Sequence, residues 1–141
     1  MFYQPIILPL LAQVALTLLV WVYMYITRVG EMSRKRVDPQ SLEARTGVQN
    51  LLTESAGPAD NFKNLFEMPV LFYLAILLSL ILLIQDELLV QLAWGFVILR
   101  ALHSVIHCSY NRVMHRFVVY VASSLVLMLM WLRLALFVLT Q

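Results

Sequence analysis

The stretch from Asp60 to Tyr73, D-N-F-K-N-L-F-E-M-P-V-L-F-Y, marks the point where a polar segment of the chain passes into a long apolar run. Asp60, Asn64 and Glu67 are spaced three and four residues apart, so they would share one face of a helix, with Lys63 beside them. Carboxylates and amides are costly at the rim of a membrane unless they are paired or used. The stretch therefore indicates a functional site on a membrane helix.

The composition indicates that lipid is the main solvent of this chain. Of its 141 residues, 62% are hydrophobic and only 13% are charged, whereas a soluble domain carries about 25% charged residues. The net charge of +2 is too small to indicate nucleic-acid binding. The single cysteine, Cys108, permits no intramolecular disulfide and no paired-cysteine zinc or redox motif. We therefore expect an integral membrane protein with no nucleic-acid partner.

Four apolar runs predict an all-α membrane bundle of four helices, in one domain over residues 1–141. A bilayer core of roughly 30 Å needs about 20 helical residues, and each run reaches that length with its flanks. The first run is expected to span the membrane rather than to be a cleaved secretory signal, because its apolar segment is too long and lacks a basic start. The predicted helices cover about 5–28, 61–84, 88–108 and 116–140, with a long polar loop over about 29–60.

Charges in the loops predict how the helices are oriented. The short connection between the third and fourth helices holds Asn111 and Arg112, whereas the turn at 85–87 is acidic. Short loops rich in lysine and arginine stay in the cytoplasm, so we expect both termini on the non-cytoplasmic side. The first loop agrees with this orientation through its basic residues Arg28, Arg34, Lys35, Arg36 and Arg45.

Pro69 lies near the start of the second predicted helix. If that helix begins close to Pro69, the missing N–H is tolerated in its first turn. If the helix begins near Asn61, Pro69 frees a carbonyl one turn back and bends the helix. We expect the kinked helix.

Polar residues of three predicted helices converge within about two turns of the same membrane face. The three basic residues of the third helix are spaced so that they share one face, which is unsuited to lipid. The converging residues are Asn64 and Glu67 on the second helix, Arg100, His103 and His107 on the third, and Arg116 and Tyr120 on the fourth.

Two plainer interpretations compete with a shared site. Basic residues at helix ends often face lipid headgroups, which suits Lys63 and Arg112 better than the deeper Arg100 and His103. His103 and His107 are also spaced as a metal-binding pair that Glu67 could complete, but no H-E-x-x-H motif surrounds them. We favour a site without a metal ion.

The same residues carry a family resemblance. The patterns Lys63-Asn64-x-x-Glu67, Arg100-x-x-His103-x-x-x-His107 and Arg116-x-x-x-Tyr120 resemble the MAPEG family, the membrane-associated proteins of eicosanoid and glutathione metabolism. The resemblance covers nearly the whole chain. The spacing resembles most closely the branch of microsomal prostaglandin E synthases, while N-L-F-E-M-P-V-L-F-Y resembles the bacterial branch.

This resemblance implies a homotrimer that binds glutathione in clefts between subunits. Lys63 would grip a carboxylate of the tripeptide, while Asn64 and Glu67 would hold its backbone and amine. Arg116 would stabilise the glutathione thiolate, because a nearby guanidinium favours the charged form of a thiol. The residues expected to support the ligand are Arg100, His103, His107 and Tyr120, and Arg28 of the first helix is expected to approach it.

The resemblance also implies a function. We expect a glutathione-dependent transferase or peroxidase of the bacterial inner membrane that acts on a lipophilic small molecule entering from the lipid. A non-catalytic lipid-binding or scaffolding member of the family is the alternative. The chain has Asp60 where relatives carry an arginine, and His107 where the closest relatives carry a tyrosine, so its ligand contacts differ from theirs.

Overall fold

The computed structural model describes residues 5–140, and it confirms the all-α membrane bundle. In this part of the chain, four helices or helix pairs are long and apolar enough to cross a membrane. They are α1 (Ile7–Lys35), α3 (Ala56–Asn64) followed by α4 (Met68–Ile81), α5 (Glu87–Cys108) and α6 (Val113–Leu139).

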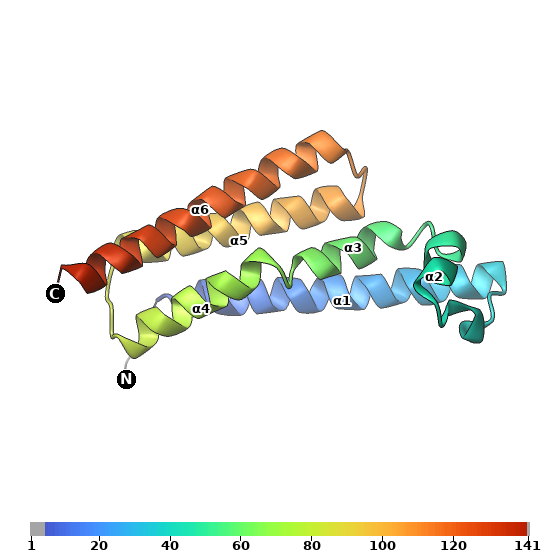
Figure 1. Ribbon diagram of the computed structural model, residues 1–141, viewed down its shortest axis with the longest axis horizontal. Helices are drawn as coiled ribbons and strands as arrows, with labels where there is room; N and C mark the ends of the chain where they lie inside the picture. The colour runs from blue at the N-terminus through green and yellow to red at the C-terminus, as the bar shows by residue number, and fades with distance from the viewer. Residues whose placement is uncertain (1–4, 141) are drawn as a thin grey trace.

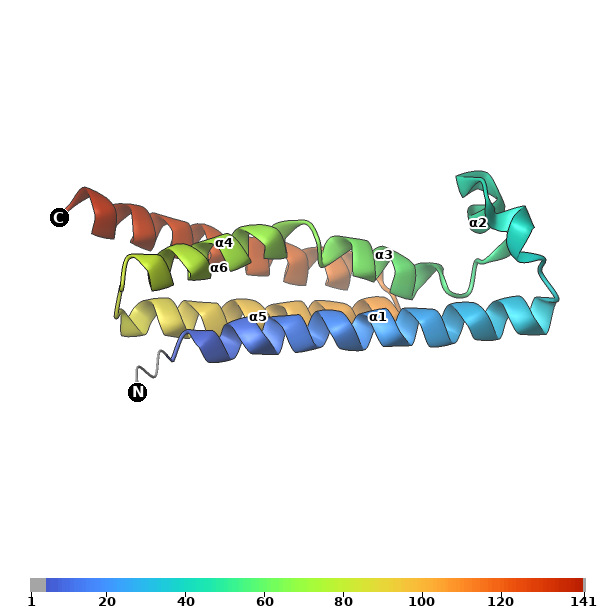
Figure 2. The same cartoon turned by 90° about the horizontal axis from the view of Figure 1, so that it is seen from below.

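Successive spans run antiparallel, and the connections therefore alternate between two ends of the bundle (Figure 1). The start of α1, the 82–86 connection and the end of α6 lie at one end. The segments 36–55 and 109–112 lie toward the other end, which we call the loop end. Figure 2 shows α1 and α5 in one layer, with α3, α4 and α6 in the other.

Helix α1 continues beyond Arg28, the predicted end of the first span. Its 29 residues measure about 43 Å at 1.5 Å per residue, which exceeds a bilayer core of roughly 30 Å. Arg36, with a φ of 51°, ends the helix in the left-handed region. The predicted 29–60 loop therefore includes the last two turns of α1, and it also holds the short 3-10 helix η1 (Pro39–Leu42) and α2 (Arg45–Leu51).

The second span is broken rather than kinked. Helix α3 ends at Asn64 and α4 begins at Met68, so Pro69 lies in the first turn of α4, and the expectation of one continuous bent helix was wrong. The proline ring has no N–H to give to the carbonyl of Leu65 and collides with a helical carbonyl at that position. The chain instead turns through short-range bonds such as Phe66 N to Lys63 O at 2.9 Å.

Aromatic and aliphatic side chains fill the centre of the bundle. Phe72 of α4 stacks on Phe96 of α5 with ring centroids 4.7 Å apart. The surrounding buried residues are Ala75 and Ile76 on α4, Ala93 and Val97 on α5, and Leu127, Met130 and Leu134 on α6. The outer faces of the spans are also apolar, as a lipid-facing surface or a subunit interface requires.

Candidate functional site

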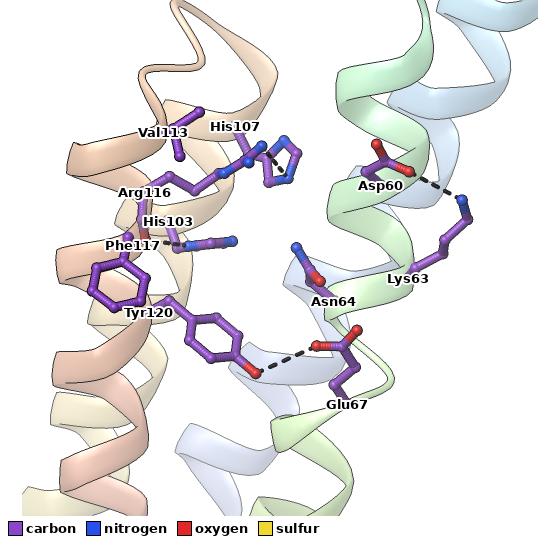
Figure 3. Close-up of a pocket in the computed structure, with 10 residues that line it drawn as sticks. All are labelled: Asp60, Lys63, Asn64, Glu67, His103, His107, Val113, Arg116, Phe117 and Tyr120. Atoms are coloured by element: carbon purple, nitrogen blue, oxygen red, sulfur yellow. Dashed lines mark hydrogen bonds and ion pairs between the residues drawn. The ribbon is translucent and has the colours of Figure 1, made fainter. Parts of the chain in front are cut away.

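A cleft of about 450 Å³ opens between α3 and the ends of α5 and α6. This volume lies in the range of small-molecule sites. Figure 3 shows its two walls, one from α3 and the start of α4, the other from α5 and α6. The lining residues are Asp60, Lys63, Asn64 and Glu67 on the first wall and His103, His107, Val113, Arg116, Phe117 and Tyr120 on the second.

The break between α3 and α4 places Glu67 at the edge of the cleft. The Tyr120 hydroxyl reaches across from α6 and donates to the Glu67 carboxylate at 3.3 Å. The Asn64 amide lies beside the same carboxylate, and with its oxygen and nitrogen exchanged it donates to both Glu67 oxygens at 3.3 Å. Glu67 remains exposed and keeps lone pairs for a further donor.

Lys63 and Asp60 form an ion pair at the mouth of the cleft. The Lys63 ammonium donates to an Asp60 oxygen at 3.0 Å, and both side chains are more than half exposed, at 67% and 58%. Figure 3 shows the Lys63 side chain on the outer side of α3, turned away from Arg116. A pair this exposed contributes little to stability, so both charges stay available to a ligand.

The two histidines of α5 are buried and hold Arg116 in place. His103 Nδ1 lies 3.2 Å from the Arg116 carbonyl, which can only accept, so Nδ1 carries the proton. His107 Nε2 lies 3.0 Å from Arg116 Nη1 and therefore accepts from the guanidinium. His103 Nε2 is left buried without a partner among residues 5–140, and Figure 3 shows the imidazole projecting toward the cleft.

Two hydrogen bonds from one amino group orient the Arg116 side chain. Nη1 donates both to His107 and to Asn111 Oδ1, the latter at 2.8 Å. Asn111 adopts a φ of 48°, a left-handed conformation that asparagine tolerates, and it closes the turn between α5 and α6. Contacts within residues 5–140 leave the Arg116 Nη2 group without a protein acceptor. The guanidinium is thus fixed in direction yet able to bind an anion.

Arg100 lies behind the cleft rather than in its lining. Its side chain is 0% exposed, and Nη2 donates to the Asn64 carbonyl at 2.8 Å. The guanidinium carbon is 5.4 Å from the Tyr120 ring centroid, a cation–π distance. Arg100 therefore joins α3 to α5 and supports the tyrosine that touches Glu67.

Most of the predicted site residues meet at this cleft. Arg28 lies elsewhere: it lines a second cleft of about 500 Å³ with Arg45, and Lys63 and Asp60 separate the two spaces. No group of histidine, cysteine and carboxylate side chains within residues 5–140 could hold a metal ion. Site roles for Asn111, Val113 and Phe117 are not predicted from the sequence, although Phe117 directly follows Arg116.

The sequence model of the MAPEG family matches residues 6–136. The chain belongs to the MAPEG family. MAPEG proteins are generally membrane-bound, glutathione-dependent transferases and peroxidases, and they are typically trimeric. Neither the curated proteins nor the solved structures include a significant match to this chain. The three motifs that carried the resemblance all lie within the matched residues.

Proposed function

We propose that this MAPEG protein is a glutathione-dependent transferase or peroxidase that acts on a lipophilic electrophile. The observation that carries the proposal is the arrangement across the cleft. Arg116 offers a free guanidinium amino group on one wall, and Glu67 offers an exposed carboxylate with Asn64 on the other. A peptide thiol with an ammonium group and an anionic sulfur can bind there, because the carboxylate suits the ammonium and the guanidinium suits the sulfur.

Glutathione would bind with its amine toward Glu67. A carboxylate accepts strongly from an ammonium, and the Asn64 amide can pair with the neighbouring peptide groups. Lys63 lies at the mouth, where it can attract a carboxylate of the ligand in competition with Asp60. His103 Nε2 offers a buried acceptor to an N–H of the ligand.

The thiol would lie against Arg116. A free thiol has a pKa of about 8.5, and a cation within a few ångströms favours the thiolate, which is the nucleophile. In a transfer reaction the thiolate sulfur forms a bond to the electrophilic carbon of the second substrate while the leaving group departs with the electron pair of its bond. The guanidinium is already oriented, so it stabilises the anionic sulfur before attack and needs no rearrangement during the reaction.

Three further properties belong to this proposal. The protein would assemble as a homotrimer, with the apolar outer faces of the spans buried between subunits or in lipid. The lipophilic substrate would enter laterally from the membrane of a bacterial cell. The loop end, with its basic residues, would face the cytoplasm, and both termini would face away from it.

The test is glutathione turnover by the purified protein in detergent or nanodiscs. We expect conjugation or peroxidase activity with a panel of hydrophobic electrophiles, and a loss of roughly 10²–10³ in kcat for Arg116→Ala, the magnitude found when one oriented donor to a developing anion is removed. Arg112→Ala is the matched control, because Arg112 is exposed at the start of α6 and lies outside the cleft.

Two results would contradict the proposal. Absence of turnover across the whole panel, with glutathione still binding, would favour a non-catalytic lipid-binding or scaffolding role. Equal losses in Arg116→Ala and Arg112→Ala would show that the general positive charge of the loop end is responsible, and not the oriented guanidinium.

A further inference from the structure

Glu31 is a buried carboxylate outside the cleft. It lies in the last two turns of α1, beyond Arg28, yet it is only 2% exposed. Glutamate is almost never fully buried unless it is paired or hydrogen-bonded. We therefore expect the buried Glu31 carboxylate to accept hydrogen bonds from neighbouring donors.

Four donors surround the Glu31 carboxylate. Oε1 accepts from Lys35 Nζ at 2.6 Å and from the Glu54 backbone N–H at 2.9 Å. Oε2 accepts from the Ser55 backbone N–H at 2.8 Å and from the Ser55 hydroxyl at 2.7 Å. Lys35 in turn donates to the Leu51 carbonyl at 3.2 Å. The pair of Glu31 and Lys35 thus fixes the segment 51–55 to α1.

Ser55 is the N-cap residue that directly precedes α3. Helix α3 has only nine residues, its first turn has no side-chain cap, and a break separates it from α4. An isolated helix of this length is marginal in water, so its position depends on tertiary contacts. The hydrogen bonds to Glu31 hold the backbone at its N-terminal end.

Contacts with α5 hold the rest of α3. The buried Asn61 accepts from the Ser104 hydroxyl at 3.3 Å and donates to Cys108 Sγ at 3.5 Å. Gly57 lies so close to α5 that an added Cβ would meet the His107 carbonyl oxygen at 3.0 Å. At the C-terminal end, Arg100 donates to the Asn64 carbonyl. These contacts fix α3 against α5. Helix α3 also packs along α1, and within residues 5–140 the hydrogen bonds that join α1 to the start of α3 come from Glu31.

We propose that Glu31 is a positioning residue for the ligand site: it fixes the start of α3 and so sets the placement of Lys63, Asn64 and Glu67 on their wall of the cleft. The effect on glutathione rests on the proposed function, whereas the effect on α3 does not. Arg116 and both histidines lie on the other wall, and their hydrogen bonds within residues 5–140 do not involve Glu31. Loss of the carboxylate should therefore weaken ligand binding without changing the thiolate.

The experiment compares Glu31→Ala, Glu31→Gln and Glu54→Ala with the wild-type protein. Glu54 is the matched control, because its side chain is 55% exposed and pairs on the surface with Arg34 and Lys35. Hydrogen exchange of backbone amides measures how readily α3 opens, and the separate changes in KM and kcat measure the effect on the site. The wild-type protein is also titrated with glutathione by calorimetry.

We expect Glu31→Ala to speed amide exchange in Ala56–Asn64 by about tenfold or more while exchange in α5 and α6 stays unchanged. The KM for glutathione should rise by about tenfold with kcat within about twofold, the pattern expected when only uniform binding is lost. Glu31→Gln should be intermediate, because its amide oxygen still accepts from Ser55. Glu54→Ala should match the wild-type protein.

Unchanged exchange in α3 would overturn the inference, and so would equal acceleration in all helices, which would indicate a general loss of stability. A fall in kcat at constant KM would also contradict it. If the wild-type protein shows no glutathione binding in the calorimeter, the proposed function fails by itself. The exchange measurement then still decides whether Glu31 positions α3.

Discussion

Arg100 combines complete burial with incomplete pairing. Its Nε and Nη1 groups have no partner among residues 5–140, while Nη2 bonds to the Asn64 carbonyl and the guanidinium faces Tyr120. Burying a charge is expensive, and replacing it by an apolar side chain of similar volume is often neutral or stabilising. We infer that Arg100 offsets this desolvation cost in function, because its charge attracts an anionic ligand and its contacts support the wall of the cleft.

Replacing Arg100 by methionine should therefore separate stability from binding. For Arg100→Met we expect a thermal midpoint within about 3 °C of the wild-type value or above it. We expect the Kd for glutathione to rise about tenfold, which corresponds to about 1.4 kcal/mol. Differential scanning fluorimetry and calorimetry measure the two quantities, with Arg112→Met as the surface control. A midpoint lowered by more than about 5 °C with an unchanged Kd would mean that Arg100 is structural only.

The broken second span is the element that shapes the first wall of the cleft. In a continuous helix, Asn64 and Glu67 would share one face and point the same way. With the break at 65–67, both residues still line the cleft, but Glu67 lies outside the regular helix, where its carboxylate meets the Tyr120 hydroxyl. Asn64 stays in α3, with its carbonyl held by Arg100. Pro69 prevents the two helices from joining, because a helical bond from residue 69 to Leu65 is impossible.

Removing this proline should extend the helix through the break. In Pro69→Ala, the new N–H can bond to Leu65, so we expect slower amide exchange over 65–70 and a Kd for glutathione raised about tenfold. Pro9→Ala is the matched control, since Pro9 is also a buried proline in the first turn of a span but lies at the opposite end. A Kd that stays at the wild-type value, despite slower exchange, would refute the role given to the break.

The sequence predicts the second wall of the cleft better than the first. His103, His107 and Arg116 could be placed together because helical periodicity and short connections fix depth and face. The break could not be predicted, since Pro69 is compatible with either a kink or a new helix start. The role of Glu31 depends on contacts with Glu54 and Ser55, more than twenty residues away in sequence, which no local pattern encodes.

At the scale of the whole molecule, the charges of the connections agree with one orientation. The loop end holds Arg34, Lys35 and Arg36, whereas the 82–86 connection at the other end contains Asp86, which binds Arg133 of α6 at 2.6 Å. Arginine near a helix end can extend to the interface, and here it meets a carboxylate there. In the proposed orientation, the charge of Arg133 at the non-cytoplasmic surface is therefore neutralised by Asp86.

Two exposed glutamines provide a matched test of this orientation. Gln40 lies near the loop end and Gln85 lies in the opposite connection. In a Cys108→Ser background, we expect a membrane-impermeant maleimide to label Gln85→Cys on intact cells and to label Gln40→Cys only after permeabilisation. The reverse pattern would place the loop end, and with it the cleft, outside the cytoplasm.

The most direct test of the central claim is the ultraviolet difference spectrum of glutathione bound to the purified protein. At neutral pH, where most free glutathione is a thiol, the account predicts a thiolate absorbance that titrates to saturation with the wild-type protein and with Arg112→Ala. Arg116→Ala should bind glutathione and show none. A bound ligand that stays a thiol in the wild-type protein, or a thiolate that survives in Arg116→Ala, would contradict the account.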